Sequence, residues 1–156
     1  MIFQKFILTK QKLIMILKKN KPILMIAGEP KSIFFEILFK SLKNNKFKSP
    51  IILIGSKNLL QSQMRIFKYK KDIRLINYKN LKKTKLNNKF INLINVNFDK
   101  KKVNIYIKDC FDFAFKILRS KLTNKFINGP VNKSSFLNKK YLGITEYIGK
   151  RFKVKK

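Results

Sequence analysis

Histidine and tryptophan are both absent from this chain of 156 residues, which contains a single cysteine. Without histidine, the chain cannot form a histidine-based metal site, a Ser–His couple or a Cys–His couple. One cysteine excludes an internal disulfide and is typical of a reducing cytosol, so we expect a cytoplasmic protein. No apolar run is long enough to span a bilayer, and we expect no membrane partner.

Acidic residues are also scarce, since 7 Asp and Glu stand against 38 Lys and Arg, giving a net charge of +31. Such a balance is typical of nucleic-acid binders. The lysines are scattered from Lys5 to Lys156, however, and accompany many Ile, Asn and Phe, which are residues of AT-rich codons. Mutational bias therefore explains the charge as well as a binding face does. A basic nucleic-acid-binding α/β module is an alternative function.

Two parts of the chain differ in regularity. Residues 1–20 are predicted to be an N-terminal extension, whose apolar residues near helical spacing also permit a membrane-surface helix. Three lysines, Lys5, Lys10 and Lys12, interrupt the apolar residues of this segment too often for the hydrophobic region of a secretory signal. Residues 21–156 are predicted to form a single α/β domain, the length of one ordinary domain.

Strands and helices alternate from Pro22 onward. Continuous apolar runs at 22–27, which Gly28 follows, and at 50–55, which ends in Gly55, predict strands buried on both faces. Ser32 is predicted to cap a helix that ends at Asn44–Asn45, and a second helix is predicted over 58–67. This βαβα order predicts a largely parallel sheet with flanking helices and right-handed crossovers.

The next stretch is less regular. A weak strand is predicted at 73–76, a polar connection at 80–89 and an alternating strand at 90–96. A turn is predicted over Asp99–Lys102, and a last strand over Phe126–Asn128.

A strong amphipathic helix is predicted to begin at Asp109, with Asp109 or Asp112 near its positive end. Phe111 and Phe115 recur on one face, so they are predicted to be core rather than stacking platforms for bases. Cys110 lies among them and is predicted to be a buried thiol, not a nucleophile.

The last strand runs into Gly129-Pro130-Val131-Asn132-Lys133, and Gly143-Ile144-Thr145-Glu146 follows ten residues later. Glycine lets backbone approach a ligand closely, and polar side chains just past a strand end face the crevice where α/β proteins bind ligands. Asn132, Lys133 and Thr145 are therefore candidate site residues. Two ordinary surface turns, or a helix start with a solvated lysine, are the alternative interpretations.

Together with Gly28-Glu29-Pro30 and Glu36, these two motifs resemble the N-terminal half of the 4-hydroxythreonine-4-phosphate dehydrogenase family of pyridoxal phosphate biosynthesis. Their order and spacing agree over roughly residues 21–152. The chain departs from the family pattern at Lys31, Ser32, Phe34 and Phe35, and at Ile144, where the family has a substrate-contacting histidine.

The resemblance implies the first portion of a two-lobed fold similar to isocitrate and isopropylmalate dehydrogenases, and a homodimer. It implies NAD-dependent oxidation, then decarboxylation, of the phosphorylated substrate 4-phosphooxy-L-threonine with a divalent metal. Thr145, Asn132, Lys133 and the position of Ile144 are the implied substrate-binding residues, whereas Glu29 and Glu36 are expected to be structural.

No residue is assigned as catalytic, because the family's metal-binding histidines and its nucleotide-binding segments follow the third motif and are missing from these 156 residues. The chain is thus expected to be truncated and inactive alone. A non-catalytic partner of a full-length relative is a further alternative.

Overall fold

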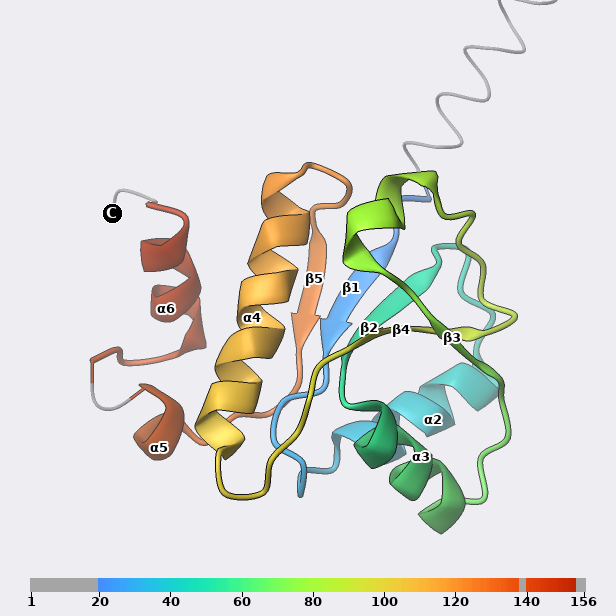
Figure 1. Cartoon of the computed structure of the whole chain (residues 1–156), viewed down its shortest axis with the longest axis horizontal. Coiled ribbons are helices and arrows are strands. Elements are labelled where there is room, and N and C mark those ends of the chain that lie inside the picture. Colours follow the sequence, from blue (N-terminus) through green and yellow to red (C-terminus); the bar gives the residue numbers. More distant parts are fainter. Residues whose placement is uncertain (1–19, 138–139, 154–156) are drawn as a thin grey trace, which may run out of the picture.

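A five-stranded parallel sheet forms the centre of the computed structural model, which describes residues 20–137 and 140–153 (Figure 1). The strand order is β3-β4-β2-β1-β5, and every neighbouring pair is parallel. The predicted α/β class with a parallel sheet is confirmed. The strands are β1 (Ile23–Ile26), β2 (Ile51–Gly55), β3 (Ile73–Leu75), β4 (Ile91–Asn95) and β5 (Lys125–Asn128).

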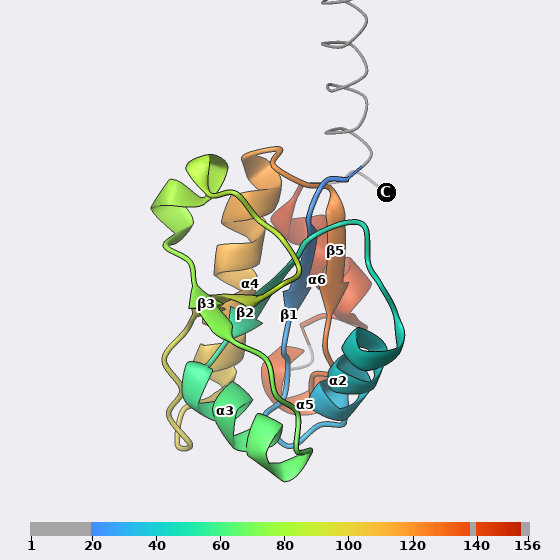
Figure 2. The same ribbon diagram turned by 90° about the vertical axis from the view of Figure 1, so that its right-hand side faces the viewer.

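Helices connect the strands and cover both faces of the sheet, as Figures 1 and 2 show from two directions. They are α2 (Phe34–Asn44), α3 (Lys57–Ile66), the 3₁₀ helix η1 (Tyr78–Lys83), α4 (Val103–Arg119), α5 (Lys133–Leu137) and α6 (Ile144–Arg151). The predicted N-terminal extension lies almost wholly outside the described residues. None of the helices that the structure describes is long and apolar enough to cross a membrane.

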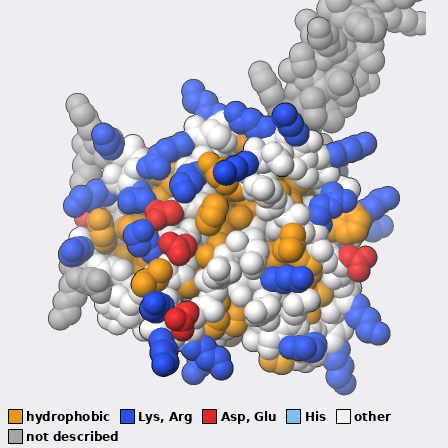
Figure 3. All heavy atoms as spheres, in the orientation of Figure 1, with side chains coloured by type: hydrophobic (Ala, Val, Ile, Leu, Met, Phe, Trp, Pro, Cys, Tyr) orange, Lys and Arg blue, Asp and Glu red, His pale blue; other side chains and the backbone are white. Residues whose placement is uncertain are grey.

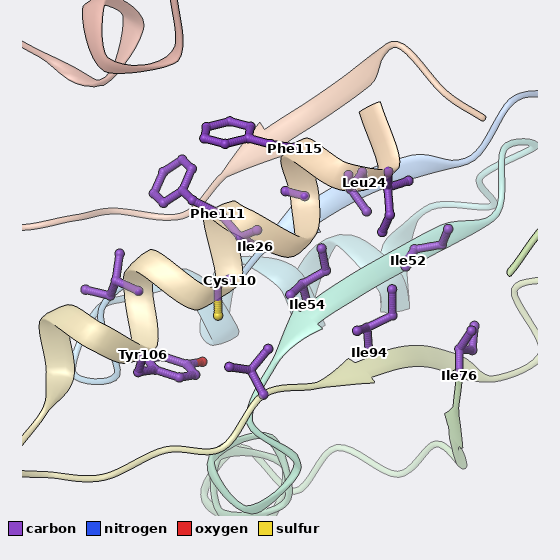
Figure 4. Packing of buried hydrophobic residues seen from close by; sticks show 14 of the residues in the cluster. Leu24, Ile26, Ile52, Ile54, Ile76, Ile94, Tyr106, Cys110, Phe111 and Phe115 are labelled. Carbon is purple, nitrogen blue, oxygen red and sulfur yellow. The ribbon is translucent and has the colours of Figure 1, made fainter. Parts of the chain in front are cut away.

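Side-chain alternation along the strands divides the core into two layers. Leu24, Ile26, Ile52 and Ile54 point to the face covered by α4, where they meet Phe111 and Phe115 (Figure 4). On the opposite face, Leu53 and Leu93 pack with α2 and α3. Burial on both faces explains why β1 and β2 are continuous apolar runs in the sequence.

The strand expected at 90–96 is confirmed as β4, but it is buried on both faces instead of alternating between buried and exposed residues. Asn92 produces the apparent alternation, but its side chain is 1% exposed. Its Nδ2 donates hydrogen bonds to Ile51 O at 2.9 Å and Asn87 O at 2.8 Å. A buried amide that finds backbone partners is tolerated in a central strand. The connection that follows β3 also contains η1, which its polar composition did not predict.

Helix α4 begins at Val103 rather than at Asp109, so neither Asp109 nor Asp112 lies at its positive end. The apolar face continues backward through Tyr106 and Ile107, which are both buried. Asp112 instead accepts from Lys108 Nζ at 2.8 Å and pairs with Arg151 of α6. The carboxylate therefore ties α6 to α4 instead of complementing a helix dipole.

The N-cap expected at Ser32 is also displaced. Ile33 is the cap residue of α2, although Ser32 Oγ accepts a long hydrogen bond of 3.4 Å from Phe34 N.

Cys110 is 1% exposed, and burial raises the pKa of its thiol to about 12. A protonated, buried thiol is a poor nucleophile, which confirms the core assignment.

Positive charge covers the surface broadly. Figure 3 shows many Lys and Arg side chains scattered over one face, with few Asp or Glu among them. Charge alone therefore does not locate a binding site on this molecule.

Candidate functional site

The carboxyl ends of β1 and β5 lie side by side because the two strands pair in parallel, with Ile26 opposite Asn128. Beyond these ends the chain leaves in opposite directions. The segment after β1 leads to α2 on one face, and the segment after β5 leads to α5 and α6 on the face of α4. Such a switch point opens a crevice at the end of a parallel sheet, where α/β proteins bind their ligands.

Two glycines allow the loops after β1 and β5 to approach each other closely. Gly28 has a φ of +71°, and a Cβ added there would lie 2.3 Å from Pro130 O. A Cβ added at Gly129 would lie 2.3 Å from Ala27 O. Hydrogen bonds from Gly129 N to Ile26 O and from Glu29 N to Pro130 O, both 2.8 Å long, complete the contact. The first and second motifs are therefore one structural unit, although they lie about a hundred residues apart in sequence.

Glu29 and Asn132 complete this unit with side-chain contacts. A carboxylate oxygen of Glu29 accepts a hydrogen bond from Asn132 N at 3.3 Å. Asn132 Oδ1 accepts from Ser135 N at 3.1 Å and from Ser134 Oγ at 2.7 Å, so it caps the start of α5. Glu29 is thus a structural link between loops, as expected from the sequence. Glu36 is on α2, where it forms an exposed pair with Lys40 at 2.6 Å.

A pocket of about 470 Å³ opens beside these contacts, between the strand ends and the N-terminus of α4. Glu29, Asn132 and Ser135 line it from the two loops, while Lys101, Lys102 and Asn104 line it from the start of α4. The first turn of α4 carries no acidic residue and its N-cap makes no side-chain hydrogen bond. Two lysines beside a helix N-terminus that has no acidic residue in its first turn favour an anionic ligand such as a phosphate or a carboxylate.

Sequence reasoning missed the contribution of α4 to this pocket. Lys101 and Lys102 were assigned only to a turn, which does exist, since Lys102 N donates to Asp99 O at 3.0 Å. The available signal was a run of three lysines immediately before an amphipathic helix, at a sheet end where other polar residues gather. In a chain with 38 Lys and Arg, that signal has little weight.

The remaining predicted site residues lie outside the pocket lining. Lys133 is the first residue of α5 and is exposed. Ile144 and Thr145 open α6, where Ile144 packs against the core on the α4 side and Thr145 is exposed. Glu146 Oε2 accepts from Leu142 N at 2.7 Å, so the third motif is the start of a helix whose first turn bonds back to a residue that precedes it. The structure therefore joins Asn132 to Glu29, whereas among the described residues no hydrogen bond joins Thr145 to Asn132 or Lys133.

Metal ligands are not gathered anywhere in residues 20–137 and 140–153, where no three His, Cys, Asp or Glu side chains form a cluster. Glu29, the one carboxylate at the pocket, already accepts a backbone hydrogen bond. The donors present therefore do not fit a divalent metal, and we assign no step to one.

Fold and site together define an α/β three-layer domain with an anion-favouring pocket at a sheet switch point. No protein-family model and no curated protein sequence matches the chain. Among solved structures, the chain is similar to a 4-hydroxythreonine-4-phosphate dehydrogenase from Burkholderia phymatum, with a TM-score of 0.73 and 17% identity over 87% of this chain. It is also similar to the enzyme from Klebsiella pneumoniae and a putative one from Salmonella typhimurium, both with a TM-score of 0.69 over 83% of this chain, at 19% and 17% identity.

These similarities confirm, at the level of the fold, the resemblance carried by the three motifs. The chain spans 44% of the length of each of these dehydrogenase chains. At such low identities the likeness concerns architecture, and the residues of the site need their own argument.

Proposed function

We propose that this chain forms the substrate-side part of an NAD-dependent dehydrogenase that acts on 4-phosphooxy-L-threonine in pyridoxal phosphate biosynthesis. The observation that carries the proposal is the contact between Gly28-Glu29 and Gly129-Pro130, which places two dehydrogenase-like motifs at one switch point beside a pocket. A homodimer, as the resemblance implies, belongs to the same proposal.

In this proposal, the pocket receives the charged end of the substrate. Lys101 and Lys102 attract its phosphate or carboxylate, and the α4 N-terminus adds N–H donors. Asn132 is supported by its place in the lining, whereas Lys133 and Thr145 are supported by their motifs alone. Ile144 cannot hydrogen-bond to substrate, so its position contributes apolar packing only.

Binding of 4-phosphooxy-L-threonine should weaken about tenfold in the Lys102→Gln variant, because a hydrogen bond to a charged group is lost. Isothermal titration calorimetry measures this directly. Thr145→Val and Lys133→Gln test the motif-based assignments in the same way. Lys116→Gln is the matched control, since Lys116 is exposed on the same helix as the pocket but far along it. Equal affinities for Lys102→Gln and Lys116→Gln would remove the pocket from the proposal.

Turnover by the 156-residue chain on its own is expected to be absent. Neither its composition, which lacks histidine, nor its described residues provide a ligand set for the metal that the proposed reaction uses. We expect no NADH absorbance when the purified chain is mixed with NAD, a divalent metal and substrate. Measurable NADH formation, retained after treatment that removes contaminating enzymes, would contradict this account of the site.

A further inference from the structure

A second, larger groove lies on the opposite side of the sheet from α4, along helix α3 and the segment that leads to β3. Its volume is about 860 Å³. Five cationic residues line it, against one carboxylate at Asp72: Lys57, Arg65, Lys68, Lys70 and Lys71. Half of the ten lining residues are thus cationic.

The cations form a row rather than a cluster. Lys57 is the first residue of α3, and Arg65 is in its last turn. A helix of 10 residues is about 15 Å long, and Lys68, Lys70 and Lys71 belong to the turn after it and to the segment that leads to β3. A single phosphate would need convergent donors, whereas a row of this length matches successive phosphates along a strand.

An aromatic residue stands within the row. Tyr69 lines the groove, and its ring stacks on the buried Phe39 with 4.6 Å between the centroids and 11° between the planes. Tyr69 N donates to Met64 O at 2.9 Å, and Lys68 adopts a left-handed φ of 47°, so the turn after α3 holds the ring in place. Half-buried Met64 and Ile73 extend the apolar floor.

We propose that this groove binds single-stranded nucleic acid, with the row of cations along the phosphates and the Tyr69 ring as a stacking platform for a base. This activity does not depend on the dehydrogenase proposal, because the groove and the strand-end pocket share no lining residue. The combination of a cationic groove with a fixed aromatic ring is the usual composition of sites that bind single strands without sequence readout.

The test compares two variants with the same change in net charge. Arg65→Gln/Lys68→Gln/Lys70→Gln removes three cations from the groove. Lys79→Gln/Lys82→Gln/Lys83→Gln removes three exposed cations from η1, whose Leu81 packs into the core layer on the α4 side of the sheet. Binding of a fluorescently labelled 12-nucleotide oligo-uridine is measured by anisotropy over a series of salt concentrations, and circular dichroism confirms that each variant is folded.

We expect the groove variant to bind at least tenfold more weakly than the unmodified chain, and the η1 variant less than threefold more weakly. The slope of log K against log salt should also fall by about 2 in the groove variant, since each lost phosphate contact contributes roughly 0.7 for single strands. Equal losses in both variants would show that only net charge acts and would overturn the proposal. So would equally tight binding of inorganic polyphosphate at the same phosphate concentration, because the Tyr69 platform would then contribute nothing.

Discussion

Replacing Gly28 by alanine is expected to lower the free energy of unfolding by about 3–5 kcal/mol, a large part of the stability of an ordinary domain. Two costs add at this position. The φ of +71° costs a residue with a Cβ about 1–2 kcal/mol. The new Cβ would also lie 2.3 Å from Pro130 O and 2.7 Å from Gly129 C, which are backbone atoms that cannot rotate away. Denaturant titration of the variant provides the measurement.

Gly149 offers a matched control within the same chain. It lies inside α6, and a Cβ added there would meet nothing within 4 Å. Gly149→Ala should therefore raise the free energy of unfolding by about 0.4–1 kcal/mol, because alanine loses less conformational entropy in a helix. If Gly28→Ala and Gly149→Ala changed stability alike, the close approach of the two strand-end loops would not exist in solution.

Much of the sheet is predictable from the sequence because its signals are local. The continuous apolar runs at 22–27 and 50–55 correspond to β1 and β2, with Gly28 just after the first strand and Gly55 at the end of the second. Helix α4 was only partly predictable, since Asp109 and Asp112 suggest a helix start by charge. The structure places both in mid-helix because the apolar face of α4 continues back through Tyr106 and Ile107. Asp112 pairs with Lys108 one turn earlier and with Arg151, which lies 39 residues away in sequence. The long-range pair leaves no local pattern to find.

The candidate site shows the same division between local and long-range signals. Gly28, Gly129 and Asn132 could be chosen as turn and strand-end residues from their neighbours alone. Their mutual contact could not, because it depends on β5 pairing with β1 after a crossover of the sheet. The lysines of the pocket and of the α3 groove were hidden by the general excess of lysine. Only their grouping in space distinguishes them.

One buried side chain of α4, Phe111, contacts the sheet and both α5 and α6. It is 0% exposed, and its ring meets Phe126 of β5, Phe136 of α5 and Tyr147 of α6 at centroid distances of 6.2, 5.4 and 5.4 Å. Substituting Phe111 by alanine should therefore cost about 3–5 kcal/mol. Because α5 carries Lys133 and α6 carries Thr145, both motif-assigned residues should lose their positions relative to the pocket.

Amide hydrogen exchange separates this effect from general destabilisation. In Phe111→Ala, we expect α5 and α6 to lose protection first, while β1, β2 and β4 stay protected, since the helices on the other face keep their own core layer. Phe113→Ala is the matched control on the same helix: Phe113 is half-buried and meets Tyr78 at 5.8 Å, so it should cost only about 1 kcal/mol. Uniform loss of protection across the sheet in Phe111→Ala would mean that α5 and α6 unfold together with the strands, and that the two motif-bearing helices are an inseparable part of the core.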